Sequence, residues 1–132
     1  MSARGVLGTA ILAALRENDA IRDAGASVFD APPVRAIAPY LVIEEPVLTE
    51  WGSKDRTGRE GRIGVRIIDM AERPVTARAL SAAADAALEA MAPALGEGWR
   101  IVTLNAVRSR IVRERAGWTG LNEYRVRMLR DH

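Results

Sequence analysis

Apolar residues recur at helical spacing over the first part of the chain. Ser2, a residue type that caps helix N-termini, precedes a face that would carry Val6, Leu7, Ala10, Ile11, Ala14 and Leu15. The pattern predicts an amphipathic helix over residues 3–18. Charged residues resume at Arg16 and no small-residue cleavage site follows cleanly, so we expect a folded helix rather than a secretory signal peptide.

A second helix is predicted over residues 75–92. Pro74 stands where a first helical residue would stand, and Pro93 follows the segment. The apolar stripe predicts a buried face made of Leu80, Ala84, Ala87, Leu88 and Met91. The same periodicity places Arg78, Asp85 and Glu89 on the outside.

Strict alternation of apolar and polar residues marks the clearest strand, over residues 62–67. It predicts one face made of Ile63, Val65 and Ile67 and an opposite face with Arg62 and Arg66. Shorter strands are expected over residues 27–30 and 40–43, with a hairpin arm over 47–51.

The C-terminal third predicts two more strands. Residues 99–115 form a long strand whose alternation slips near Ala106 and Val107, which indicates either a β-bulge or two consecutive strands. Residues 116–120 are expected to turn, and the last strand would bury Tyr124, Val126 and Met128 and expose Arg125 and Arg127. The element order α-β-β-β-α-β-β predicts an α+β domain with a mainly antiparallel sheet and two helices packed on one face.

Composition restricts the possible classes of protein. A chain of 132 residues with 48% apolar and 27% charged residues is expected to form one domain over residues 1–132. No apolar run approaches the roughly 20 residues needed to span a bilayer, so no membrane partner is expected. The chain has no cysteine, which excludes disulfides, thiolate metal sites and cysteine nucleophiles.

The candidate catalytic residues are few. The only histidine is His132, at the C-terminus, where a base is rarely held in place. The glycines near residue 58 lack the Gly-Lys-Ser/Thr ending of a phosphate-binding loop and precede a strand. We therefore predict no enzyme, no catalytic residue, no metal site and no cofactor.

Charge is distributed unevenly. Residues 1–50 carry four arginines against seven acids, a net −3, and residues 51–132 carry fifteen basic residues against ten acids, a net +5. Eighteen of the nineteen basic residues are arginine, which suits carboxylate and phosphate pairing at interfaces, although a high-GC codon bias explains the arginine and alanine content equally well.

Two basic regions are candidate interaction surfaces. The stretch WGSKDRTGRE, residues 51–60, predicts a long mobile hairpin loop, and the candidate residues for a subunit or partner interface are Trp51, Lys54, Arg56, Arg59, Arg62 and Trp118. The two tryptophans could equally pack onto the domain's own core. A possible DNA-facing or basic surface comprises Arg108, Arg110, Arg113 and Arg115. A basic nucleic-acid-binding module without enzymatic activity is therefore the alternative function, although interspersed acids and scarce aromatic residues disfavour it.

The order of these landmarks resembles a known family. An N-terminal amphipathic helix is followed by SVFDAPP, APYLVIEE, the WGSKDRTGRE loop, GRIGVRIID, an alanine-rich helix and a C-terminal YRVRM strand. This sequence of motifs is similar to the small tail-completion proteins (tail terminator, or head–tail joining proteins) of long-tailed phages, prophages and gene transfer agents. The resemblance covers residues 7–128.

The resemblance implies a structural virion protein, assembled in the host bacterial cytoplasm and located in the tail at the head–tail junction. Subunits of this kind form a ring, expected to be a hexamer, that caps the tail tube. The implied partners are other copies of the chain, the major tail tube protein and a head or neck connector protein. Double-stranded DNA would pass through the lumen without being read.

Overall fold

The computed structural model describes residues 1–131; His132, the one histidine considered above, lies outside the described residues. Three helices and seven strands follow one another as α1 (Ala3–Glu17), α2 (Asp19–Asp23), β1 (Ser27–Phe29), β2 (Tyr40–Ile43), β3 (Val47–Glu50), β4 (Thr57–Asp69), α3 (Val75–Glu89), β5 (Ala94–Gly96), β6 (Trp99–Glu114) and β7 (Gly117–Arg130). The α+β class is confirmed, and the structure adds α2, β5 and one further strand before α3 to the expected order.

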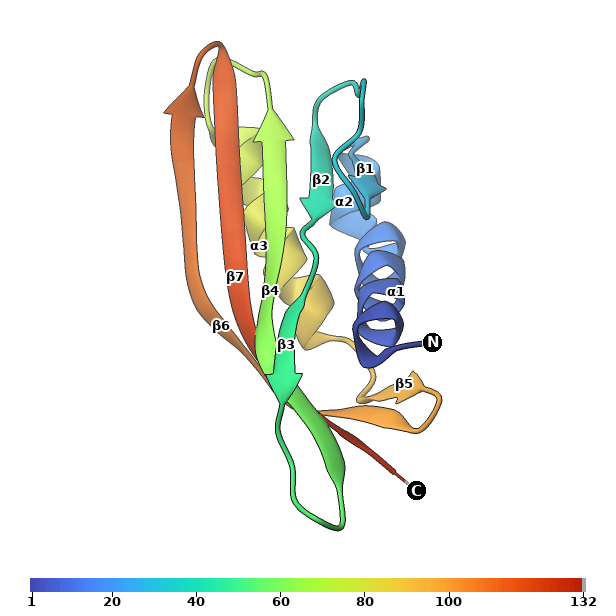
Figure 1. The fold of residues 1–132 in the computed structure, drawn as a ribbon. Helices are drawn as coiled ribbons and strands as arrows, with labels where there is room; N and C mark the ends of the chain where they lie inside the picture. The colour runs from blue at the N-terminus through green and yellow to red at the C-terminus, as the bar shows by residue number, and fades with distance from the viewer. Residues whose placement is uncertain (132) are drawn as a thin grey trace.

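The strands form one sheet in the order β1-β2-β4-β7-β6-β5, with β3 paired to the first half of β4 on the same side as β2 (Figure 1). All pairs are antiparallel except β1 with β2. The centre is a long three-stranded ribbon, because β4 pairs with β7 from Thr57 to Asp69 and β7 pairs with β6 from Trp99 to Glu114. The predicted slip in β6 is a β-bulge between Ala106 and Arg108, and a second irregularity lies between Ile101 and Thr103.

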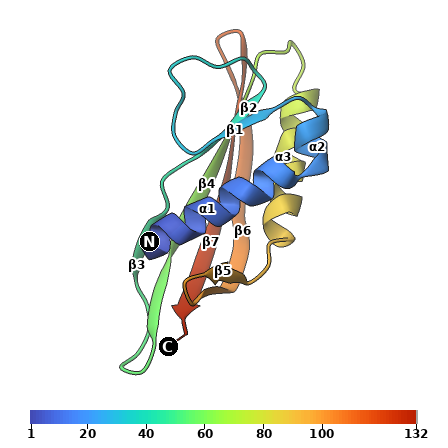
Figure 2. The same cartoon turned by 90° about the vertical axis from the view of Figure 1, so that its right-hand side faces the viewer.

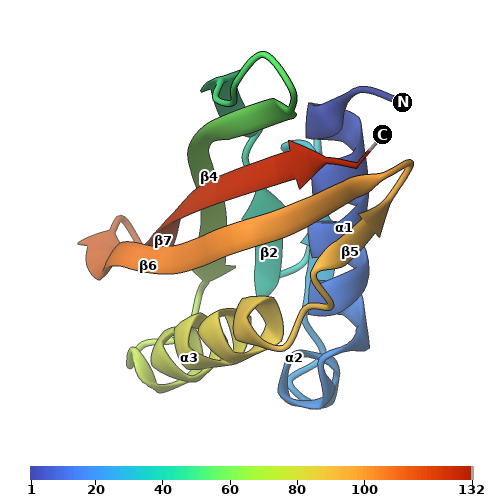
Figure 3. The ribbon, with the colours of Figure 1, turned by 90° about the horizontal axis from the view of Figure 1, so that it is seen from below.

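The helices build one hydrophobic core with a single face of the sheet. α1 contacts β1, β2 and α3, and α3 contacts β4, β6 and β7 (Figures 1 and 2). The residues of β4 and β7 that were predicted to face inward are buried in this core: Ile63, Val65, Ile67, Tyr124, Val126 and Met128. The opposite face of β4, β7 and β6 carries no helix, as the view from below shows (Figure 3), and we call it the open face.

Local signals explain where α1 begins and ends. The Ser2 side chain accepts a hydrogen bond from the Gly5 amide at 3.1 Å, as its N-cap position predicts. Asn18 ends α1 in an extended conformation and its side chain accepts from the Ile21 amide at 3.0 Å, which starts α2. The expectation of one helix over 3–18 therefore missed a second short helix, because one asparagine serves both as the end of one helix and as the cap of the next.

Two predicted loops are shorter than expected. The loop assigned to residues 51–60 ends before Thr57, because residues 57–60 are held in β4 by β7, and Arg59 and Glu60 also pair with β3 on the other side. The turn assigned to residues 116–120 is limited to Arg115 and Ala116, since β7 begins at Gly117. Both predictions failed because glycine-rich and polar segments were taken to be irregular, whereas pairing on both sides satisfies their backbone groups.

Glycine permits the close approach of β3 to β4. A Cβ built on Gly61 would lie 1.7 Å from the Val47 carbonyl oxygen, and one on Gly58 would lie 1.9 Å from the Trp51 carbonyl oxygen. No side chain fits at either position without moving the backbone. The glycines that suggested a loop are therefore the residues that allow the hairpin to close.

Helix α3 ends at Glu89 rather than residue 92, and its inner face is broader than predicted. Leu80, Ala84, Ala87 and Leu88 are buried as expected, and Met91 packs against the core from a partly exposed position. Asp85, predicted to lie outside, is half-buried and bonded to groups on β7. The reason is a polar cluster beneath the helix, described below.

Candidate assembly surfaces

The hairpin between β3 and β4 is the first candidate surface. Its tip, residues 51–56, extends beyond the helices at one end of the sheet (Figure 1). The tip is closed by two hydrogen bonds between the backbones of Ser53 and Arg56, at 3.0 and 3.3 Å. Lys54 and Arg56 are exposed there, and neither has an ion-pair partner among residues 1–131.

Trp51 lies at the base of this hairpin and on the open face. The Arg127 guanidinium lies over its ring, 5.0 Å from the centroid, and the same guanidinium pairs with Glu60 at 3.0 Å. Cation–π and ion-pair contacts together hold a half-exposed indole against β7. A large aromatic ring fixed at a surface is typical of an interface anchor.

Arg59 does not join this group. It faces the helix side, where its guanidinium lies 5.7 Å from the centroid of the buried Trp99 ring, and Arg130 approaches the same ring at 5.9 Å. The grouping of Arg59 with Trp51 was therefore wrong, because Arg59 is in a strand and its side chain leaves on the opposite face from that of Glu60. Trp99, which the alternation did not single out, is the aromatic residue that Arg59 covers.

Trp118 lies in β7 rather than in a turn. Its indole Nε1 donates to the Glu72 carbonyl oxygen at 3.3 Å, and Arg113 donates to the same oxygen at 2.6 Å while covering the Trp118 ring at 4.8 Å. These contacts tie the connection between β4 and α3 to the sheet. Trp118 therefore packs against residues of its own chain, and such packing was the alternative to a role at an interface.

The open face is rich in arginine side chains. By strand register, seven arginines from three adjacent strands share it: Arg62, Arg66, Arg100, Arg108, Arg110, Arg125 and Arg127. Five of them are in ion pairs: Arg62 and Arg108 with Glu123 at 3.6 and 2.8 Å, Arg66 with Glu44 at 3.0 Å, Arg127 with Glu60, and Arg100 with Asp131 at 3.3 Å. The face is positively charged, with seven arginines against Glu44, Glu60, Glu114, Glu123 and Asp131.

The four arginines predicted as a possible basic surface lie in three places. Arg108 and Arg110 lie on the open face, Arg113 lies on the helix side with Trp118, and Arg115 occupies the turn before β7 with a φ of 50°. Arg113 is three positions from Arg110 and therefore faces the other side of the strand, and Arg115 lies beyond the end of β6. All four are exposed.

A buried polar cluster beneath α3 was not predicted. Asn122 accepts from Ser81 at 2.8 Å and from Ser109 at 2.9 Å, and it donates to the Ser81 carbonyl at 2.9 Å. Tyr124 donates to Asp85. Burial, together with the hydrogen bond to Asp85, raises the pKa of Tyr124 above its usual range, so this phenol stays protonated and cannot act as a base near neutral pH. The only sequence signal was an asparagine at an inward position of a strand.

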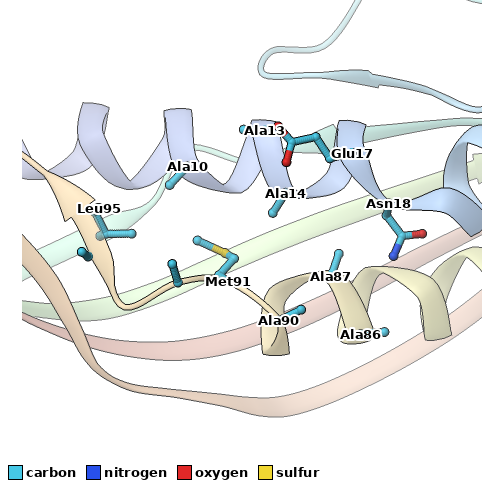
Figure 4. A pocket seen from close by; sticks show the side chains of 12 residues that line it. Ala10, Ala13, Ala14, Glu17, Asn18, Ala86, Ala87, Ala90, Met91 and Leu95 are labelled. Atoms are coloured by element: carbon cyan, nitrogen blue, oxygen red, sulfur yellow. The ribbon is translucent and has the colours of Figure 1, made fainter.

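The cavity between α1 and α3 is lined by few polar side chains. It has a volume of about 430 Å³ and is lined mainly by alanines, with Met91 and Leu95 at one end and Glu17 and Asn18 at the other (Figure 4). Asn18 is already engaged as the cap of α2. Such a lining offers no convergent polar groups to orient a cofactor.

Residues 1–131 also contain no group of three or more acidic or histidine side chains placed to hold a metal ion. No helix in this range is both long and apolar enough to cross a membrane. The surfaces with distinctive chemistry are therefore the hairpin, the open face and the edge strand β6.

The family model described as Tail completion protein gp17 matches residues 9–129. A chain of the solved virion of a native gene transfer agent (GTA) particle is similar in fold, with a TM-score of 0.77 and 24% sequence identity over 98% of this chain and 99% of that chain. A search of the curated proteins found no match.

Proposed function

This chain belongs to the family of tail completion proteins, and on that premise we propose that it closes the head-proximal end of a tail tube as a ring of identical subunits, with six as the expected number. The protein is a structural component of the tail of a phage-type particle. The ring would stop tube polymerisation and offer a surface to the neck of the capsid. This role applies to a phage, a prophage or a gene transfer agent.

The family match over residues 9–129 is the observation that carries this proposal, because it spans nearly all of the described chain. The geometry supports it in two ways. Within residues 1–131, most of β6 has no second strand beside it, and the open face has no helix over it (Figure 3). Both are surfaces that an oligomer or a partner would cover.

The β3–β4 hairpin is proposed to meet the tube or the neck. Trp51 supplies a fixed aromatic surface, and Lys54 and Arg56 project from the tip without internal partners among the described residues. Arg62 lies farther along β4, on the open face. A hairpin of this kind can reach a neighbouring component without changing the core.

DNA passing through the ring would meet the arginines of the open face. Phosphate contacts of this type are independent of base sequence and weaken steeply with salt. The alternative function, a nucleic-acid-binding module, is less well supported, since five of the seven open-face arginines are already in ion pairs with Glu44, Glu60, Glu123 or Asp131. No catalytic role is proposed.

Deletion of the gene in a particle-producing host tests the proposal. Electron microscopy should show heads and tails that fail to join, with tails of irregular length, and expression of this chain in trans should restore complete particles. Purified protein should also bind one end of tubes made of the major tail protein. Normal particles from the deletion strain would refute the proposal.

A further inference from the structure

The outer edge of β6 is the longest unpaired strand edge in residues 1–131. β5 covers only its beginning, through pairs at Trp99 and Arg100, and a hydrogen bond from the Ile101 amide to the Pro93 carbonyl ends that contact. From residue 102 to 114, β6 pairs with β7 on one side and with no strand on the other. Exposed edges of this length attract another chain unless they are protected.

The side chains along this edge combine positive charge with apolar groups. Residues 105–115 carry four arginines against Glu114, a net +3, and we call this segment the basic edge. Val102, Val107 and Val112 are exposed on the same strand, at 41%, 42% and 38%. Arg110 and Arg115 have no ion-pair partner among the described residues.

The other side of the molecule is negative. Residues 16–30, from the end of α1 through α2 and β1, carry four acids against Arg16 and Arg22, a net −2, and we call this segment the acidic end; its acids are Glu17, Asp19, Asp23 and Asp30. All four are exposed and unpaired within residues 1–131. Figures 1 and 2 place α2 and β1 on one side of the molecule and β6 on the other.

The sheet edge at the acidic end is closed to strand pairing. β1 has only three residues, and the Arg16 guanidinium donates to its Val28 carbonyl at 2.8 and 3.3 Å. Pro32 and Pro33 follow the strand and lack backbone amide donors. This end therefore presents carboxylates rather than a free ladder to a neighbour.

We propose that the basic edge of one copy docks against the acidic end of a second copy, head to tail. Arg110 and Arg115 would pair with carboxylates of the acidic end, and the exposed valines of β6 would be covered. Pairing of two β6 edges with each other is disfavoured, because it would bring two segments of net +3 together. A head-to-tail contact repeats around a closed ring, so this inference rests on the proposed ring and names its subunit contact.

Charge reversal in two separate full-length variants tests the contact. The first carries Arg110→Glu and Arg115→Glu, and the second carries Asp19→Arg and Asp23→Arg. All four residues are exposed, so both variants should fold; the melting temperature of the second should fall by no more than a few degrees, because Asp19 lies in the first turn of α2. Each variant alone should assemble into rings at least about tenfold more weakly than wild type, free or on tail tubes, because like charges now meet.

An equal mixture of the two variants should restore assembly to near the wild-type level. Every contact in an alternating ring again joins opposite charges. An isologous β6–β6 contact is distinguished by the second variant alone, which keeps a wild-type β6 and would then assemble normally. The control exchanges an exposed ion pair elsewhere, Arg4→Glu with Glu45→Arg, and should leave ring assembly unchanged. The readouts are native mass spectrometry and negative-stain imaging.

The outcomes separate this inference from the proposed function. Rings formed normally by each variant alone would overturn the inference and leave the ring proposal standing. Failure of the mixture to recover would overturn the head-to-tail pairing, as would a first variant that loses only DNA binding. A wild-type chain that forms no ring, even on tail tubes, would overturn both.

The absence of native cysteine allows a direct check. Copies carrying Arg110→Cys mixed with copies carrying Asp23→Cys should cross-link as mixed dimers in assembled rings. A cross-link confined to two Arg110→Cys copies would show the β6–β6 contact instead and refute the proposal.

Discussion

Arg127 covers the ring of Trp51 at 5.0 Å and pairs with Glu60 at 3.0 Å, so one guanidinium joins the last strand to the base of the β3–β4 hairpin. The contact keeps a large aromatic side chain at a fixed place on the open face. Since Trp51 is only half-buried, its surface remains available to a partner. Two predictions compare it with Trp118, which has similar chemistry and different surroundings.

Trp51→Ala should lower the free energy of unfolding by only about 1 kcal/mol, because a surface cation–π contact and a half-exposed ring are lost. Binding to tail tubes and particle completion should fall strongly. Denaturant unfolding and tube pelleting measure the two effects. Arg59→Ala is the matched control, since Arg59 lies on the other face. A large loss of stability in Trp51→Ala would instead assign Trp51 to the core.

Trp118→Ala should lower the free energy of unfolding by about 2–3 kcal/mol, because the Arg113 contact and the hydrogen bond to Glu72 disappear together. Trp118→Phe keeps an aromatic ring for Arg113 to cover and loses only the hydrogen bond to Glu72, so its free energy of unfolding should fall by only about 1 kcal/mol. Thermal unfolding of the two variants measures the difference. If Trp118→Ala folds normally but fails to assemble, Trp118 is an interface residue.

Tyr124 should make the protein less stable at high pH. Its pKa is raised in the folded state, so the native protein keeps a proton that the unfolded chain releases above about pH 10. This contribution to stability is fully present below that pH and is lost as pH rises above it. Urea unfolding from pH 8 to 11 should show a steeper decline for wild type than for Tyr124→Phe. Equal slopes would contradict the assigned environment.

Gly61→Ala should destabilise the domain by about 1–3 kcal/mol and displace β3, because the added Cβ meets the Val47 carbonyl. Gly8→Ala is the control, since a Cβ there has nothing within 4 Å. In the middle of α1 it should stabilise the protein by about 0.5–1 kcal/mol. Chemical denaturation compares the two; equal effects would show that β3 yields to the new methyl group.

Several features were predictable from the sequence alone because they depend on local periodicity. The helix cap at Ser2, the inward faces of β4 and β7 and the bulge near Val107 follow from spacing and residue type. The order of motifs also indicated the family, and the match of the family model to residues 9–129 confirms it. These signals are carried by neighbours in the chain, and the core requires them in any arrangement of the sheet.

Only the tertiary structure decided which side chains meet. Residues 57–60 look like a loop in the sequence, but all four pair with β7, and Arg59 and Glu60 pair with β3 as well. That pairing places Arg59 over Trp99 and Arg127 over Trp51. Asp85 looks like a surface residue of a helix until Tyr124 is placed beneath it. The sequence shows that one segment is rich in acids and another in arginines. Strand order decides that these two segments lie on opposite sides of the molecule, and strand order is a long-range property that no local pattern encodes.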